Sequence, residues 1–282
     1  MTLNVAVVGP KTIWLLCDRR LSYCGGRPPK DDARKVMILE TIDKGTAICA
    51  YSGLGATARG TEPSDWMSAV LRGRNFPLEQ SLGVLAQTVR REFPRHMLQM
   101  PGEGTPAHNI VVPAFLDGEP KLYHIGLACA RDRKTHAFGY WSHEVRITTV
   151  GLSGSGGAHL QRKSIEWKDA LVRAVEAHDS GQLSPDAVAD HLAKLNYGVS
   201  RHDKTVGPRC VVVWRGKTGG GGSAAYTRRT RDRRGPSLPL IAGGTDLAAI
   251  FAKLGTMKWS RLGNDEVPSL ADIPTTPDEK LR

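Results

Sequence analysis

Thr2 is the residue of this chain with the clearest chemical potential, because it directly follows Met1. Methionine aminopeptidase removes an initiator methionine readily when the next residue is small, so we expect Thr2 to become the first residue. Its hydroxyl and a free α-amine would then share one residue. An α-amine has a pKa of about 7.7–8.0, so near pH 7 part of it is neutral and able to accept a proton. A hydroxyl activated in this way is an established nucleophile for amide bonds.

The overall composition narrows the class of protein. The chain has 282 residues, enough for one large domain or two small ones, and a formal net charge of +11. Its five cysteines are widely spaced and form no C-x-x-C pair, which is typical of reduced thiols in a cytoplasmic protein. We find no export signal and no run approaching the roughly 18 apolar residues of a membrane span. We therefore expect a cytoplasmic protein without a membrane partner.

The elements that must position Thr2 begin with a β-meander. Short apolar runs fill the first quarter of the chain, and turn residues such as Gly9-Pro10 and Gly45 separate them. This pattern is typical of hairpins. We expect strands over 3–8, 13–17, 35–39 and 46–51.

Helical patterns and further strands follow. Apolar residues recur at helical spacing from Leu78 to Phe93, after Pro77, and we expect Pro94 to end or kink this helix. Runs of strands followed by runs of helices favour an α+β fold in which two sheets pack face to face with helices outside both. We expect the other helices from Ser64, over 158–178, 184–195 and 246–254. We expect the other strands over 110–115, 121–125, 145–150 and 210–214.

The composition changes after residue 216. A glycine run, an arginine block over 228–234 and several prolines follow. We expect a globular domain over 1–216 and a partly flexible extension over 217–282 that is rich in Gly, Arg and Pro. The arginine block could bind phosphates of nucleic acid. It has no interleaved aromatic residue beyond Tyr226 and no recognised nucleic-acid module, so a solvated linker is the favoured interpretation.

Over about residues 2–216, the chain resembles the proteasome β subunits and their bacterial relatives, the N-terminal nucleophile (Ntn) threonine peptidases. The resemblance implies the α+β fold of the Ntn hydrolases, a four-layer αββα sandwich of two antiparallel sheets, here with a C-terminal extension. The matching elements are Thr2, Asp18-Arg19-Arg20, Lys35-Val36, Ser52-Gly53-Leu54-Gly55, Ser153-Gly154-Ser155, and Arg201-His202-Asp203 followed by Gly207.

The resemblance also implies a role for each residue of the site. Thr2 would attack a peptide carbonyl, and Lys35 would lower the pKa of its hydroxyl by positive charge. Asp18 would hold Lys35 in place. Ser153 and Asp203 would orient the α-amine.

Two further groups complete the implied site. The backbone N–H of Gly53, or of Ser52, would stabilise the oxyanion. An apolar pocket for the residue before the scissile bond would be lined by Leu21, Ala33, Met37 and Ala50.

Three positions depart from the family pattern. Asn4 replaces a small hydroxyl residue, and Ser52 stands where glycine is preferred. Val206 stands where a serine is expected just before Gly207, which removes one predicted support of the amine.

The implied activity is that of a threonine protease, a hydrolase acting on peptides or unfolded proteins within a homo-oligomer, with a possible unfoldase partner and no cofactor. The histidines lack ligand spacing, so we expect no zinc site. Two alternatives remain. One is a small-molecule amidase of the same fold. The other is a catalytically silent scaffold, or a basic binding protein that acts through its C-terminal tail.

Overall fold

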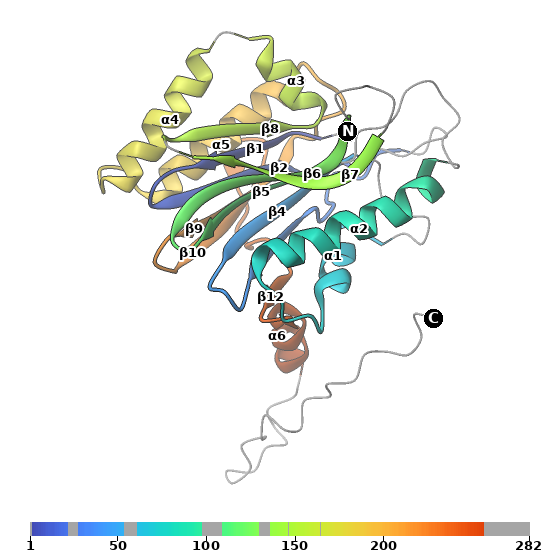
Figure 1. The fold of residues 1–282 in the computed structure, drawn as a ribbon. Helices are drawn as coiled ribbons and strands as arrows, with labels where there is room; N and C mark the ends of the chain where they lie inside the picture. The colour runs from blue at the N-terminus through green and yellow to red at the C-terminus, as the bar shows by residue number, and fades with distance from the viewer. Residues whose placement is uncertain are drawn as a thin grey trace.

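The structure is a computed structural model that describes residues 2–21, 28–53, 61–97, 109–129, 136–145, 147–163 and 165–256. The described strands form two sheets that are antiparallel except for one parallel pair, β12 with β3. Figure 1 shows helices α3, α4 and α5 together on one side of the sheets and α1 and α2 on the other. The chain is therefore α+β, as its order of elements predicts.

One sheet has six strands in the order β11-β10-β9-β2-β1-β8. Strand β1 lies beside both β2 and β8, and it pairs Asn4 with Cys17 on one side and with Ser153 on the other. This register brings the beginning of β1 next to the end of β2 and the end of β8. The strands are β1 (Asn4–Val8), β2 (Thr12–Asp18), β8 (Thr149–Ser153), β9 (Arg209–Gly216), β10 (Gly221–Thr227) and β11 (Thr230–Arg231).

The other sheet has seven strands in the order β13-β12-β3-β4-β5-β6-β7. Its strands are β3 (Val36–Glu40), β4 (Thr46–Ser52), β5 (Asn109–Leu116), β6 (Glu119–Cys129), β7 (His136–Glu144), β12 (Leu240–Ala242) and β13 (Thr245–Asp246). The helices are α1 (Pro63–Leu71), α2 (Leu78–Met97), α3 (Ser155–Gln161), α4 (Glu166–Asp179), α5 (Pro185–Ser200) and α6 (Leu247–Thr256).

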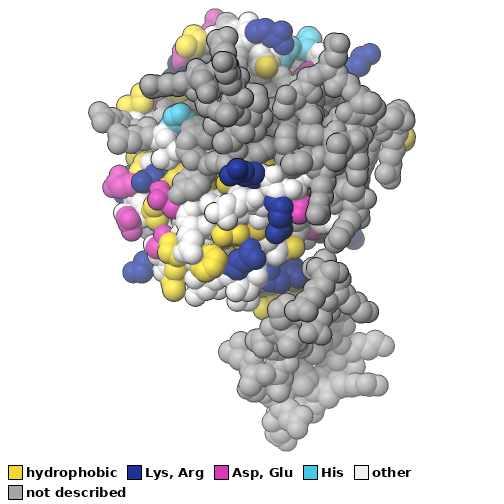
Figure 2. Space-filling view, turned by 45° about the vertical axis from the view of Figure 1, so that its right-hand side comes forward, with side chains coloured by type: hydrophobic (Ala, Val, Ile, Leu, Met, Phe, Trp, Pro, Cys, Tyr) yellow, Lys and Arg dark blue, Asp and Glu magenta, His cyan; other side chains and the backbone are white. Residues whose placement is uncertain are grey.

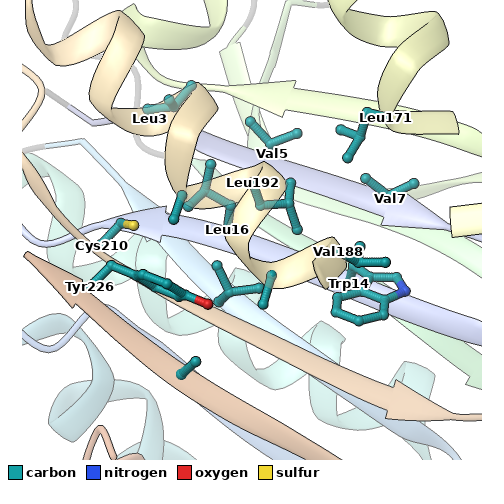
Figure 3. Close-up of a cluster of buried hydrophobic side chains, with 14 of the residues drawn as sticks. Leu3, Val5, Val7, Trp14, Leu16, Leu171, Val188, Leu192, Cys210 and Tyr226 are labelled. Carbon is teal, nitrogen blue, oxygen red and sulfur yellow. The ribbon is translucent and has the colours of Figure 1, made fainter. Parts of the chain in front are cut away.

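Alternation along the strands divides the core into three clusters. On β1, Val5 and Val7 pack toward α4 and α5, while Ala6 and Val8 belong to a cluster shared by the two sheets. Figure 3 shows Val188 and Leu192 of α5 facing the strands of the six-stranded sheet. The third cluster joins β3, β4, β5 and β6 to α1 and α2. Both sheets are thus held by apolar burial on both faces, which fixes the strand ends that carry the site.

Several boundaries differ from the sequence predictions. Helix α2 does not end at Pro94 but continues to Met97. The helix expected over 158–178 is two helices, because α3 ends at Gln161 and α4 begins at Glu166. The strand expected over 145–150 lies later, at 149–153, and β7 was not expected.

The segment after residue 216 contributes to both sheets. Strand β10 pairs with β9 from Gly221 to Thr227, and β12 pairs with β3. The interpretation of Gly219–Gly222 and the arginine block as a solvated linker is therefore wrong where these residues form the β10–β11 hairpin. The boundary between domain 1–216 and extension 217–282 stays a prediction, and residues 257–282 lie outside the described residues.

The basic charge does not form one continuous surface on the face drawn in Figure 2. There the Lys and Arg side chains lie in separate patches, and Asp and Glu side chains gather toward the left. Within the described residues, no helix is both long and apolar enough to cross a bilayer.

Candidate active site

Three buried residues from three strand ends meet at one point. Thr2 precedes β1, Asp18 ends β2 and Lys35 precedes β3. The Nζ atom of Lys35 lies 2.8 Å from Oγ1 of Thr2 and 2.9 Å from Oδ1 of Asp18. At most 2% of each residue is exposed. The structure therefore brings together the three residues that the sequence places far apart.

The Asp18 carboxylate is held by backbone donors as well as by Lys35. Its Oδ1 accepts the N–H of Leu3 at 2.8 Å, and its Oδ2 accepts those of Arg20 at 2.9 Å and Gly207 at 3.0 Å. Because a buried carboxylate needs such partners, these bonds make its position rigid. They also tie the end of β2 to the start of β1 and to the loop before β9.

The Lys35 ammonium has three donors and uses all of them. It donates to Thr2, to Asp18 and to the backbone oxygen of Arg20 at 2.9 Å. The backbone oxygen of Lys35 in turn accepts the N–H of Tyr51 at the end of β4. The ammonium is therefore aimed at the Thr2 hydroxyl from a fixed position.

Glycines allow the segment after β8 to approach the backbone of Thr2. The N–H of Gly156 donates to the Thr2 carbonyl oxygen at 3.2 Å. Gly154 has a φ of +83°, and a Cβ there would lie 2.0 Å from the same oxygen. Only glycine fits this conformation and this contact.

Ser155, between those glycines, belongs to a hydroxyl network with the late loop. Its Oγ lies 2.7 Å from Oγ1 of Thr205, which donates to Oδ1 of Asp203 at 2.6 Å. The N–H of Thr205 donates to the same oxygen at 2.9 Å. Partial burial raises the pKa of Asp203, but the bonds from Thr205 and Ser155 outweigh burial and hold it below its usual value. Asp203 is therefore an ionised acceptor at neutral pH.

Ser153, which the resemblance places beside the α-amine together with Asp203, lies outside this network. The Oγ of Ser153 accepts a hydrogen bond from Nδ2 of Asn4 at 3.1 Å and one from Oγ of Ser52 at 3.3 Å. Among the described residues, Ser153 makes no hydrogen bond to Thr2 or Asp203. Because Ser153 is still part of strand β8, its side chain follows the alternation of that strand, whereas Ser155 begins α3.

Sequence reasoning missed Ser155 and Thr205. The second serine of Ser-Gly-Ser and the hydroxyl two residues after Asp203 are the signals that could have indicated them, since such hydroxyls commonly close short turns. Val206 is fully buried in the cluster that contains Leu3, so its side chain does not replace the expected serine. The nearby hydroxyl comes from Thr205 instead.

The predicted oxyanion donors lie at the end of β4. The Ser52 side chain is buried, and its Oγ lies 3.3 Å from Oγ of Ser153 and 3.4 Å from the backbone oxygen of Asn109, either of which can accept its one proton. Gly53 has a φ of 144°, which favours glycine. Residues 54–60, including the Leu54-Gly55 part of the turn, lie outside the described residues.

The four predicted pocket residues do not share one surface. Leu21, Ala33, Met37 and Ala50 are all buried. Met37 packs in the cluster with α1 and α2, whereas Ala50 packs in the cluster between the sheets. These two side chains lie on opposite faces of one sheet because strand side chains alternate, so they cannot line the same pocket wall.

A rival nucleophile next to this cluster is not reactive. Cys17 neighbours Asp18 and is fully buried. Burial raises the pKa of its thiol to about 12, although the Lys35 charge acts in the opposite direction. A thiol with such a pKa stays protonated at neutral pH. Among the described residues, no group of three or more His, Cys, Asp or Glu side chains could hold a metal ion.

Comparison with known proteins gives structural neighbours only. No protein-family model matches the chain, and no curated protein matches it. A structure titled as the helical assembly of the Anbu complex from Pseudomonas aeruginosa is 14% identical, with a TM-score of 0.52, and covers 96% of this chain and 99% of its own. Anbu (ancestral beta-subunit) from Yersinia bercovieri is 14% identical, with a TM-score of 0.49 and coverage of 95% and 100%. An Anbu (Gly-1) mutant from Hyphomicrobium sp. strain MC1 is 12% identical, with a TM-score of 0.45 and coverage of 95% and 100%.

These neighbours correct the resemblance drawn from sequence. The chain has the fold of the Pseudomonas aeruginosa Anbu protein over nearly its whole length. Anbu proteins are proteasome-like relatives but a distinct family, so identification of the chain as a proteasome β-subunit peptidase is wrong. The spacing of the motifs therefore predicted the α+β fold of the chain but not its structural neighbours.

Proposed function

We propose that this chain is a threonine-type amide hydrolase in which Thr2, exposed by loss of Met1, is the nucleophile and peptides are the substrate. The observation that carries the proposal is the 2.8 Å contact between Nζ of Lys35 and Oγ1 of Thr2. A buried ammonium at this distance favours the alkoxide form of the hydroxyl. If Lys35 served only to neutralise Asp18, its ammonium would not have to lie within hydrogen-bond distance of the Thr2 hydroxyl.

Each proposed step follows from a named group. Oγ1 of Thr2 attacks the amide carbonyl carbon, and the α-amine of Thr2, through a water molecule, takes the hydroxyl proton. That proton passes to the leaving nitrogen as the C–N bond breaks. A water molecule then hydrolyses the ester and restores the hydroxyl. Positioned proton transfer of this kind contributes roughly 10²–10⁴ in rate.

The supporting groups divide into two sets. Lys35 and Asp18 act on the hydroxyl, and the network of Ser155, Thr205 and Asp203 orients the α-amine. The N–H of Gly53 or Ser52 stabilises the oxyanion, a contribution of about 2.7–4 kcal/mol. Ser153 contacts Ser52 and so helps to hold the end of β4 in place.

The same proposal covers the architecture and the assembly. The three core clusters support a four-layer αββα arrangement of the Ntn-hydrolase type. The Pseudomonas aeruginosa neighbour is described as a helical assembly, which supports a homo-oligomer here. A cytoplasmic location and an unfoldase partner stay predictions.

Intact-mass measurement of the purified full-length protein, with and without a threonine-directed epoxyketone, tests the proposal. We expect the untreated protein to lack Met1 and the treated protein to gain one adduct, located on Thr2 by peptide mapping. Thr2→Ala should abolish the adduct while leaving thermal unfolding close to that of the wild type. Retained Met1, or an adduct that persists in Thr2→Ala, contradicts the assignment of the nucleophile.

The small-molecule amidase is the second candidate function. The burial of Leu21, Ala33 and Met37, each at most 2% exposed, supports it, because side chains buried in this way present little surface to a long peptide. A fluorogenic peptide series of increasing length distinguishes the two substrate classes. Rates that rise with peptide length support the peptidase, and hydrolysis confined to single amino-acid amides supports the amidase.

A further inference from the structure

An open hollow lies where the end of helix α5 meets the turn between β10 and β11. Its volume is about 330 Å³, and it is lined by Tyr197, Arg201, Arg228, Arg229 and Thr230. This volume lies at the small end of the range of ligand sites, about 300–1,000 Å³. None of these residues belongs to the proposed catalytic machinery, so the inference does not depend on the proposed function.

Three of the residues that line the hollow are arginines, and each carries a positive charge. Among the described residues, no carboxylate lies within 4.0 Å of the guanidinium nitrogens of Arg201, Arg228 or Arg229. The neighbouring carboxylates are used elsewhere. Asp186 pairs with Arg231, Asp190 accepts the Tyr226 hydroxyl, and Asp232 accepts the Thr227 hydroxyl. Like charges gathered without a counter-charge repel one another, and an anion in the hollow would relieve that repulsion.

One of these arginines, Arg228, has an unfavourable backbone conformation. Thr227 pairs with Thr230, so Arg228 and Arg229 form a two-residue hairpin turn. Arg228 has a φ of 61°, a left-handed conformation for which such turns favour Asn or Gly. Its N–H donates to the Pro208 oxygen at 2.8 Å, which anchors the turn to the chain that leads into β9. A charged side chain kept at a strained position motivates a functional hypothesis.

The side chain of Arg229 also has a defined orientation. The guanidinium of Arg229 lies over the Tyr197 ring, 5.0 Å from its centroid. This contact orients a planar group whose N–H donors match the oxygens of a phosphate in pairs. Arg201 follows the last turn of α5 and approaches the hollow from the opposite element.

We propose that this hollow binds the phosphate group of a small phosphorylated molecule. Arginine forms paired hydrogen bonds with phosphate oxygens, and three such groups suit a doubly or multiply charged anion. Because all three arginines line one hollow of about 330 Å³, a small ligand is favoured. A polynucleotide instead requires a basic track that follows its backbone.

Isothermal titration calorimetry of the full-length protein with pyrophosphate, at constant ionic strength, tests the proposal. We expect saturable binding of one pyrophosphate per chain, with inorganic phosphate binding more weakly at the same site. The double variant Arg201→Gln/Arg229→Gln should raise the Kd at least tenfold. Thermal unfolding shows whether the variant is folded, and bound pyrophosphate should raise the Tm of the wild type alone.

The matched control removes the same charge from two other residues, both in the arginine block. Arg233 and Arg234 do not line the hollow, so Arg233→Gln/Arg234→Gln should leave the Kd within about twofold. An equal loss of affinity in both double variants shows diffuse charge attraction and overturns the proposal. Absence of saturable binding also overturns it. Single-stranded RNA that displaces pyrophosphate with an affinity rising with RNA length assigns the hollow to a polynucleotide and overturns the small-ligand proposal.

Discussion

Lys35 donates to the hydroxyl of Thr2 across 33 residues of sequence, and the contact is buried at the end of both sheets. The lysine reaches this position because Asp18 anchors it, and Asp18 is itself held by three backbone N–H groups. The nucleophile and its activating charge are thus parts of one rigid network. Reactivity and stability should therefore be coupled at this site.

Lys35→Met should destabilise the protein by about 3–5 kcal/mol, because the buried Asp18 charge loses its counter-charge. Urea unfolding measures this loss, and epoxyketone labelling of Thr2 should fall together with it. The double variant Lys35→Met/Asp18→Asn should cost clearly less than the sum of the single variants, since the uncompensated charge is gone. Additive costs would show that the two side chains are not coupled in this way.

Ser155→Ala should slow labelling of Thr2 roughly tenfold, the equivalent of about 1.4 kcal/mol in activation free energy, because it removes the hydroxyl that connects the start of α3 to Thr205 and, through it, to Asp203. The matched variant is Ser153→Ala, which removes a hydroxyl two residues earlier that contacts Asn4 and Ser52 instead. Its labelling rate should stay within about threefold of the wild type, a change below 1 kcal/mol. A larger effect from Ser153→Ala would return the amine-orienting role to Ser153.

Gly154→Ala should displace Thr2 and abolish its labelling. A Cβ at this position would lie 2.0 Å from the Thr2 carbonyl oxygen, and the φ of +83° adds strain of about 1–2 kcal/mol. Denaturation should show a loss of stability larger than the strain alone. Gly198→Ala is the control, since a Cβ there meets nothing within 4 Å. As a substitution inside α5, it should stabilise the protein by about 0.5–1 kcal/mol and leave labelling unchanged.

The sequence predicted most of the elements near the N-terminus because local signals determine them. Gly9-Pro10 and Gly45 separate apolar runs, and the structure has hairpins at both places. The spacing of Thr2, Asp18 and Lys35 was informative because each stands at the end of a predicted strand. Strand ends on two packed sheets can meet, and here they do. The roles of these residues in catalysis stay predictions.

The sequence failed where tertiary contacts override composition. Gly221–Thr227 has the composition of a linker, yet it forms β10 against β9. A Cβ at Gly222 would lie 2.4 Å from the Trp214 indole, so the glycine fits a strand that passes directly over that ring. Similarly, the sequence does not show that β8 ends at Ser153 rather than earlier. Because Ser153 is still in the strand, it is Ser155, at the start of α3, that contacts the network of Asp203.

The protein should lose stability between about pH 6.5 and pH 4 through His124 of β6. Burial, and to a lesser extent the charge of His143, lower the pKa of His124 from 6.5 to about 4. The unfolded chain therefore binds the proton first as pH falls, so this contribution is complete above pH 6.5 and is lost as pH approaches 4, with a limit of about 3 kcal/mol.

Urea unfolding across this range should give a shallower pH dependence for His124→Gln than for the wild type. Some slope should remain, because burial also lowers the pKa of His159 and His191. His143→Gln, at an exposed position, should change the slope less, since burial is the larger cause. An unchanged slope in His124→Gln would show that His124 stays accessible to protons in the folded protein.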